Sequence, residues 1–219
     1  MLKAEGGVTA CAALGTVSSR MKVYEVSTTA KPAIGNFSDY ASLAARESDR
    51  PFLGIGRGEF SGKPFSGKWR KLKLYIDKPR LPRPDFYTFG WLMFVCNERA
   101  RTIAGEALEM AGELLPVSVE GDKGLYWAFN CTNCINVTDL ESSKWRKIGK
   151  TGNHRILEKP AFIAERFGEE SIFKIPDNNG GPIYCLERTG DPDDGEFKAV
   201  VEKHGLTGLD FELIWSGKR

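Results

Sequence analysis

The hydrophobic and polar positions at the end of the chain predict a helix followed by a strand. Phe197, Val200 and Val201 lie at helical spacing, and Gly205 follows as a stop, because glycine accepts the left-handed conformation that ends many helices. From residue 209 to 215, Leu, Phe, Leu and Trp alternate with other residues. This is the period of a β-strand with one mostly buried face.

Elsewhere the same patterns predict short strands and few helices. Asn97 is expected to cap a helix over Glu98–Ala111 that Gly112 stops, and residues 37–45 are expected to form a shorter helix. A polar helix or turn is expected after Asp139, ending at Trp145. Strands are expected at residues 23–26, 69–76, 114–119, 125–137, 156–157, 161–165, 172–175, 183–186 and 209–215.

This order of elements shows no β-α-β rhythm and no internal repeat. The expected fold class is therefore α+β, with a mixed, mainly antiparallel sheet, a few helices and a single main core. The chain has 219 residues, of which 41% are hydrophobic and 27% charged, values near globular averages that argue against a wholly disordered or fibrous protein. The longest apolar run, 91–96, has the length of a strand and is too short to span a bilayer.

Three segments are expected along the chain. Residues 1–20 are expected to be a disordered extension or an over-long start, in preference to an export signal, because only one lysine precedes a weakly apolar stretch. Residues 21–83 form a glycine-rich, basic segment with a strand and a helix. Pro79, Pro82 and Pro84 stiffen the connection to the remaining segment, 84–219.

The formal net charge of +2 is unevenly distributed along the chain. Residues 1–110 carry 17 Lys and Arg against 11 Asp and Glu, whereas residues 111–219 carry 14 against 18. Much of the positive excess lies in the segment 57–83, which includes Arg57, Arg70, Lys71 and Lys73 and has aromatic neighbours that would suit nucleic acid. However, Lys71 and Lys73 alternate with apolar residues, which favours the solvent face of a strand over a nucleic-acid interface.

Cys131 and Cys134 form the only closely spaced cysteine pair. Two intervening residues let both thiols reach one metal ion or each other, which leaves zinc binding and redox chemistry open. The pair lies in a strand-like run and has no second pair beside it, so buried structural thiols are the favoured interpretation. Five cysteines without the spacing of a disulfide framework suggest a reducing cytoplasm, and no cofactor is expected.

An acidic loop precedes the last helix. Asp191, Asp193, Asp194 and Glu196 surround a proline and a glycine, at a spacing that does not match a helix-loop-helix calcium site. A solvated loop is favoured, and its charge could steer a basic partner. The chain also lacks a Gly-x-Ser-x-Gly elbow, a His-Glu-x-x-His helix and a phosphate loop. The residues alone therefore show no convincing catalytic constellation, which suits a binding protein.

Several sequence motifs resemble a family of bacterial immunity proteins encoded beside polymorphic and type VI secreted toxins. They are Asn97-Glu98-Arg99-Ala100 at a helix start, the run 112–117, the aromatic run ending at Asn136-Val137, and the terminal stretch 205–211. The resemblance covers about residues 84–215 and is weaker before them.

This resemblance implies a non-catalytic protein that binds and neutralises a cognate protein toxin. It supplies no catalytic residues. The partner contacts expected are the loop 191–196, if the toxin is basic, or the 57–83 face, if the toxin surface is acidic. Nucleic-acid binding through 57–83 is the alternative function, and a metal or redox role for Cys131 and Cys134 is the third.

Overall fold

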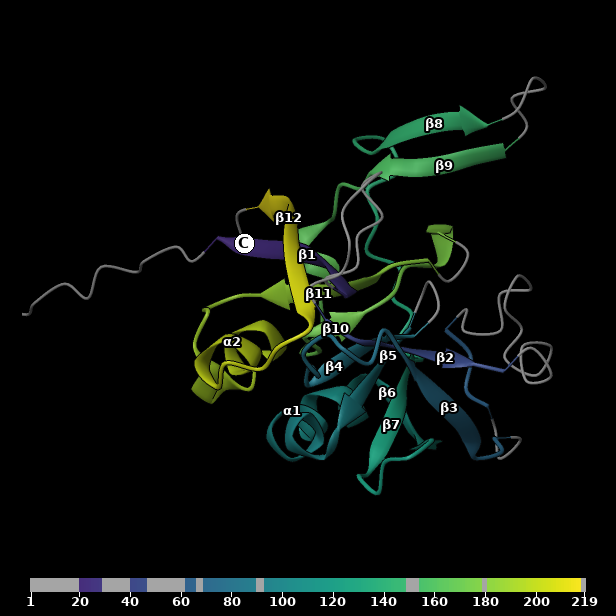
Figure 1. Ribbon diagram of the computed structural model, residues 1–219. Coiled ribbons are helices and arrows are strands. Elements are labelled where there is room, and N and C mark those ends of the chain that lie inside the picture. Colours follow the sequence, from purple (N-terminus) through teal and green to yellow (C-terminus); the bar gives the residue numbers. More distant parts are fainter. Residues whose placement is uncertain are drawn as a thin grey trace, which may run out of the picture.

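The computed structural model describes residues 20–28, 40–46, 62–65, 69–89, 93–148, 154–178 and 181–217. Within these ranges the chain forms a four-stranded sheet, a six-stranded sheet, a two-stranded hairpin and two α-helices (Figure 1). Most strand pairs are antiparallel. The α+β class expected from the sequence is confirmed. The expected segment 1–20 lies outside the described residues, apart from Arg20.

The four-stranded sheet has the order β10-β11-β1-β12, and every pair in it is antiparallel. It therefore joins the start of the described chain to its end. Its strands are β1 (Met21–Thr28), β10 (Ile172–Phe173), β11 (Ile183–Glu187) and β12 (Leu209–Gly217).

The six-stranded sheet has the order β2-β3-β6-β7-β5-β4, in which only β3 and β6 are parallel. Its strands are β2 (Ser42–Ala45), β3 (Leu72–Asp77), β4 (Phe86–Phe89), β5 (Met93–Asn97), β6 (Gly112–Val119) and β7 (Tyr126–Cys131). Because β1 belongs to one sheet and β2 and β3 to the other, the described strands of segment 21–83 form no sheet of their own. They pair into sheets shared with 84–219.

Both α-helices lie where the sequence pattern places them. Helix α1 (Glu98–Ala111) is capped by Asn97, whose side chain accepts a hydrogen bond from the Ala100 amide at 2.9 Å. Helix α2 (Phe197–Lys203) is followed by Gly205, whose φ of 56° is the left-handed conformation expected of the stop.

Gly112 has a different role from the one expected. Its φ of 173° is extended backbone, and it begins β6 directly after α1. A Cβ at this position would overlap the carbonyl group of Asn130 on the neighbouring strand β7. Glycine is therefore required here for close approach of two backbones, which no local sequence pattern reveals.

Four further sequence expectations need correction. Residues 42–45 form strand β2 where a helix was expected, because they pair with β3; residues 37–39 lie outside the described part. A polar turn does follow Asp139, whose carboxylate accepts hydrogen bonds from the amides of residues 141 and 142, but Trp145 belongs to a strand. At 161–165, Phe162 makes a single bridge and a 3₁₀ turn, η2 (Ala164–Arg166), follows. In β12, Leu213 is 53% exposed, although the alternating pattern over 209–215 placed it on the buried face.

An irregularity in the pairing of β12 with β1 lies just after Leu213. Val23 lies opposite Trp215, but the next residue, Tyr24, lies opposite Leu213, so the register shifts by one residue. Such a bulge changes which residues face the core. Ile214 and Trp215 consequently pack against the core together, although the alternating pattern assigns them to opposite faces.

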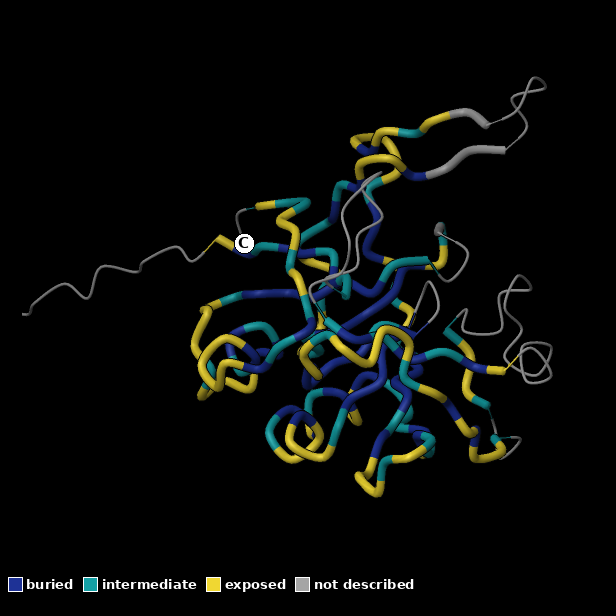
Figure 2. Tube along the Cα trace, viewed as in Figure 1, coloured by how far each residue is buried: buried dark blue, intermediate teal, exposed yellow. Residues whose placement is uncertain are grey.

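The buried side chains form three clusters instead of the single main core expected. The first joins the two sheets and both helices, through residues such as Phe86, Leu108, Phe129, Cys185 and Phe197. The second covers the other face of the six-stranded sheet, and the third covers the other face of the four-stranded sheet. Figure 2 shows the buried residues concentrated where the elements meet. Each sheet thus has apolar side chains on both faces.

A buried carboxylate holds the two helix regions together, in what we call the Asp85 junction. Asp85 is only 7% exposed and accepts hydrogen bonds from the Asn97 side chain (3.2 Å), the Arg99 guanidinium (2.7 Å), and the amide and hydroxyl of Thr207 (2.9 and 3.1 Å). Arg99 also donates to the His204 carbonyl oxygen at 2.7 Å. The junction therefore links β4, the start of α1 and the connection from α2 to β12.

Burial alone would raise the pKa of Asp85. The hydrogen bonds from Thr207, Asn97 and Arg99 outweigh that effect, so the pKa is lowered. The carboxylate therefore stays charged in the fold. Two of the motifs that carry the family resemblance, at 97–100 and 205–211, meet at this junction and contribute to the framework.

None of the helices in the described ranges has the length and hydrophobicity that crossing a membrane requires.

Candidate functional site

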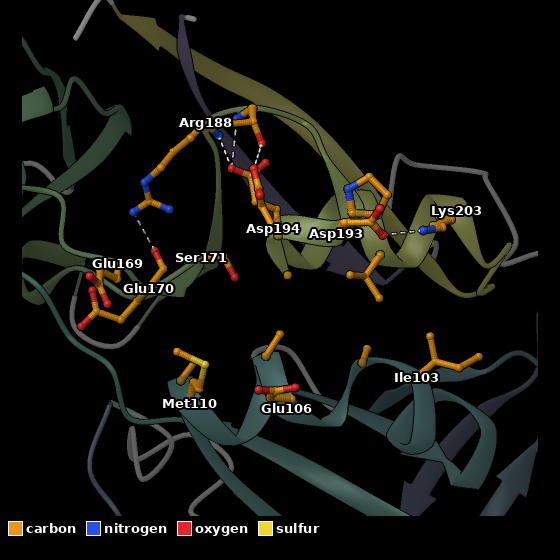
Figure 3. Close-up of a pocket in the computed structure, with 18 of the residues that line it drawn as sticks. Ile103, Glu106, Met110, Glu169, Glu170, Ser171, Arg188, Asp193, Asp194 and Lys203 are labelled. Carbon is orange, nitrogen blue, oxygen red and sulfur yellow. Dashed lines mark hydrogen bonds and ion pairs between the residues drawn. The ribbon is translucent and has the colours of Figure 1, made fainter.

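A groove of about 890 Å³ lies between α1 and the segment that leads into α2 (Figure 3). One wall is the side of α1 that carries Ile103, Glu106 and Met110. The opposite wall is formed by the 3₁₀ turn η4 (Pro192–Asp194), by Gly195 and Glu196, and by α2. The loop 168–171 and residues 188–189, which follow β11, close one end.

The side of the groove on α1 is largely apolar. Ile103 and Ala107 are half-buried and pack against the first core cluster, as does Val200 from the α2 side. Met110 is 64% exposed. Its apolar side chain would therefore gain favourable free energy on being buried. The groove therefore offers apolar surface that a partner could cover.

The polar lining of the groove is predominantly acidic. Six carboxylates line it, against two permanent cations, so its formal net charge is −4 when His204 is neutral. The cations are Arg188 and Lys203, and the carboxylates are Glu106, Glu169, Glu170, Asp193, Asp194 and Glu196. These groups come from four separate parts of the chain.

Both cations are engaged by neighbouring groups. Lys203 forms an ion pair of 2.7 Å with Asp193, which raises the pKa of the lysine and lowers the pKa of the aspartate. The Arg188 guanidinium donates hydrogen bonds to the carbonyl oxygens of Gly168 and Glu170. Figure 3 shows these contacts on the wall opposite α1. Exposed pairs such as Lys203 with Asp193 contribute little to stability and are readily replaced by other ion pairs.

Glu196, which the sequence placed among the partner contacts, is buried. It is 4% exposed, and its carboxylate accepts hydrogen bonds from three consecutive amides: Arg188 (2.7 Å), Thr189 (3.0 Å) and Gly190 (2.8 Å). Its function is to hold the turn after β11 in shape. The Glu196 carboxylate is therefore occupied within the fold, and its contact with a partner stays a prediction.

The three aspartates of the loop 191–196 are exposed, but they have different roles. Asp191 caps η4 by accepting a hydrogen bond from the Asp193 amide at 2.9 Å, and it does not line the groove. Asp194 accepts a hydrogen bond from the Thr189 hydroxyl at 2.7 Å, and both Asp193 and Asp194 lie on the groove wall. The structure thus brings two of the four predicted acidic residues to the groove as exposed groups.

A second, smaller groove of about 580 Å³ runs along the other side of α1. Arg101 lies over the Trp127 ring there, 4.5 Å from its centroid, and Leu125 is 51% exposed. Glu106 and Met110 line both grooves. Glu106 and Met110 therefore lie between the two grooves, on the exposed side of α1.

The basic segment does not converge on this groove. Arg57 lies outside the described residues, and Arg70 and Lys71 are exposed just before β3. In β3 itself Leu72 and Leu74 are buried while Lys73 is exposed, so the alternation predicted for this strand is confirmed. Lys73 lies 3.7 Å from Glu120, which also binds Arg46. These contacts are typical of the solvent face of a strand.

Two aromatic residues beside the basic segment are used in packing. Phe65 and Trp69 contact each other edge to face at 5.1 Å and pack against the second core cluster. The Trp69 indole also donates a hydrogen bond to the Pro116 carbonyl oxygen at 2.9 Å. Neither ring is therefore a freely presented surface for stacking on bases.

The cysteine pair combines one buried and one exposed thiol. Burial raises the pKa of Cys131 to about 12 and also raises the pKa of Cys134. The nearby Lys174 is 1% exposed, and burial lowers its pKa. Metal binding and thiol exchange both need a thiolate, which these environments disfavour. Among the residues that the structure describes, no three histidine, cysteine or carboxylate groups come together as metal ligands.

No protein-family model matches this chain, and no curated protein matches it.

Sequence reasoning missed most of the groove. Glu106, Glu169, Glu170 and Arg188 come from α1 and two separate loops, and only tertiary packing brings them together with the loop 191–196. The paired Glu169 and Glu170 after a glycine were a weak local signal of an acidic turn. No pattern along the sequence indicates that this turn faces α1.

Proposed function

We propose that this chain is a non-catalytic, cytoplasmic immunity protein that binds and neutralises a cognate bacterial toxin through the acidic groove. The observation that carries the proposal is the groove between α1 and η4, which combines apolar surface with a net charge of −4. The resemblance of residues 84–215 to immunity proteins supports a toxin as the partner.

The charge of the groove favours a basic partner surface. Clefts lined by one sign of charge raise the local concentration of oppositely charged groups and increase association rates by roughly 10 to 10³-fold. Asp193 and Asp194 are exposed at the rim, where they act during approach. Once the partner is bound, Met110 and Ile103 supply the apolar surface that it covers, which slows dissociation.

A co-purification experiment with matched variants tests the proposal. The tagged protein is purified from its native bacterium and co-eluting proteins are identified by mass spectrometry; each secreted protein found is then expressed with and without this chain. We expect one of them to be toxic alone and harmless on co-expression. If no co-eluting protein is toxic, the proposed function is contradicted.

A groove variant locates the contact. Glu106→Gln, Asp193→Asn and Asp194→Asn together remove three charges from the groove, while Glu141→Gln, Glu165→Gln and Asp210→Asn remove three exposed charges that do not line it. We expect the groove variant to associate with the toxin about tenfold more slowly at low salt. The control variant should associate like the wild type. Equal rates for all three proteins would exclude the groove as the contact.

A further inference from the structure

The apolar residues on the groove side of α1 form a row along the helix. Ile103, Ala107 and Met110 are spaced four and then three residues apart, which places them on one helix face. Figure 3 shows Ile103 and Met110 on the side of α1 that faces the opposite wall. The row spans about 10 Å, since each helical residue rises about 1.5 Å. This spacing matches the contacts that one helix makes when it packs along another.

The backbone groups of the polar wall are engaged within the fold. Carbonyl oxygens of the loop 168–171 accept hydrogen bonds from the Arg188 side chain and from the Leu186 amide. The amides of residues 188–190 and 193–195 all donate to acceptors within the loop 191–196. An extended segment in the groove would therefore meet side chains in place of the row of free backbone groups that a sheet edge offers.

Carboxylates lie on both sides of the apolar row. Glu106 is exposed on α1, and Asp193 and Asp194 are exposed on the opposite wall. Glu169 is exposed at the end that the loop 168–171 closes. Cations on two flanks of a bound element would therefore meet carboxylates on either side, while the apolar surface between those flanks covers the row.

We propose that the groove receives one amphipathic α-helix of the partner, with an apolar ridge at helical spacing and lysine or arginine on both flanks. A helix makes its own backbone hydrogen bonds, so it needs only side-chain contacts from the walls. About two helical turns match the length of the apolar row. This inference rests on the proposed function, because it names the part of the toxin that the groove binds.

Binding of a designed peptide, followed by fluorescence anisotropy, tests the helix without the toxin. The probe is a capped peptide of about 20 residues, a length at which isolated helices form. It carries leucines at positions i, i+4 and i+7 and lysines on both flanks. The matched peptide keeps these leucines and lysines, but a central alanine is replaced by proline, which breaks the helix. We expect the helical peptide to bind about tenfold more tightly, because only its leucines lie in one row.

Protein variants locate the bound peptide. Met110→Ser should weaken the binding of the helical peptide about tenfold, because Met110 is the most exposed member of the apolar row. Leu140→Ser is the matched control, since Leu140 is 56% exposed and does not line the groove. It should bind like the wild type. The groove variant defined above should also bind more weakly at low salt than the control variant, because it lacks three carboxylates of the groove. All four carry changes at exposed residues, so their melting temperatures should stay near that of the wild type.

Three results would overturn the inference: no binding of the helical peptide by the wild type at low salt, equal binding of the helical and proline peptides, or equal weakening by Met110→Ser and Leu140→Ser. These measurements use no toxin, so they separate the two proposals. A toxin that binds at the groove while the helical peptide does not would refute the helix alone. A helical peptide that binds at the groove, when co-purification finds no toxin, would support the helix and refute the toxin as its source.

Discussion

The Asp85 junction and the acidic groove both gather carboxylates beside the two helices, but they use them in opposite ways. Asp85 is 7% exposed and accepts four hydrogen bonds from groups on two other parts of the chain. In the groove, Asp193 and Asp194 are exposed, and each has one side-chain partner at the surface.

The difference is one of hydrogen-bond satisfaction. A buried carboxylate must have its partners inside the fold, and removing it leaves those partners without an acceptor. An exposed carboxylate remains hydrated, so it can exchange water for a partner protein at small cost. Glu196 belongs with Asp85 in this respect, although it is a neighbour of Asp194 in sequence. Burial therefore separates residues that support the fold from residues that are available for binding.

Replacing Asp85 by Ala should give the largest effect. The change leaves the Thr207 amide and hydroxyl without their acceptor, and it removes one of two acceptors from the Asn97 amide group and from Arg99. We expect the free energy of unfolding, measured by urea denaturation, to fall by about 3 kcal/mol. Asp77→Ala, at an exposed strand end, is the control and should change it by less than about 0.5 kcal/mol. Similar losses in both would remove the distinction between the two kinds of carboxylate.

Glu196→Ala should have the next largest effect. Three amides at 188–190 lose a charged acceptor, which should lower the free energy of unfolding by about 2 kcal/mol. The turn that carries Arg188 should also change, and with it one end of the groove. Glu196→Gln keeps an acceptor oxygen and should lose less. If Glu196→Ala is as stable as the wild type, the carboxylate does not organise the turn.

The pH dependence of stability should distinguish Asp85 from its exposed counterparts. Because the folded pKa of Asp85 lies below its ordinary value of 3.8, its ionised form stabilises the fold in full above that value. The contribution is lost as the pH falls through the lower, folded pKa. Urea denaturation between about pH 6 and pH 2 should therefore show a steeper acid decline in the wild type than in Asp85→Asn. Parallel curves would contradict this assignment.

The smallest effect on stability is expected for Asp193→Asn combined with Asp194→Asn. These side chains are exposed, so the free energy of unfolding should change by less than about 0.5 kcal/mol. The pKa of Lys203 should move down toward its ordinary value, because Asp193 contributes most to raising it. Lysine titration followed by NMR measures this shift. A large loss of stability would place these residues with Asp85 and not with the groove.

Local patterns predicted the elements whose signals lie in neighbouring residues. The Asn97 cap, the helical spacing in α1 and α2, and the alternation in β3 were all readable from the sequence, and the structure confirms them. Residues 42–45 were mispredicted because their strand depends on pairing with β3, which is distant in sequence. The close approach at Gly112 was hidden for the same reason.

The candidate site was less predictable than the fold. Sequence reasoning found Asp193 and Asp194, but it counted Glu196 with them because composition does not reveal burial. It also did not foresee the hairpin of β8 (Lys144–Ile148) and β9 (His154–Lys159), in which Lys144 lies opposite Lys159, because that register depends on strand pairing. Charge can be counted along a chain, whereas its placement depends on tertiary contacts.

The most direct test of the central claim measures the association rate of the purified toxin with this protein over a range of salt concentrations. We predict a rate that falls steeply with salt for the wild type and for the variant at Glu141, Glu165 and Asp210. For the groove variant at Glu106, Asp193 and Asp194 we predict a slower rate with a flatter dependence. If the groove variant keeps the rate and the salt dependence of the wild type, the toxin does not bind at the acidic groove.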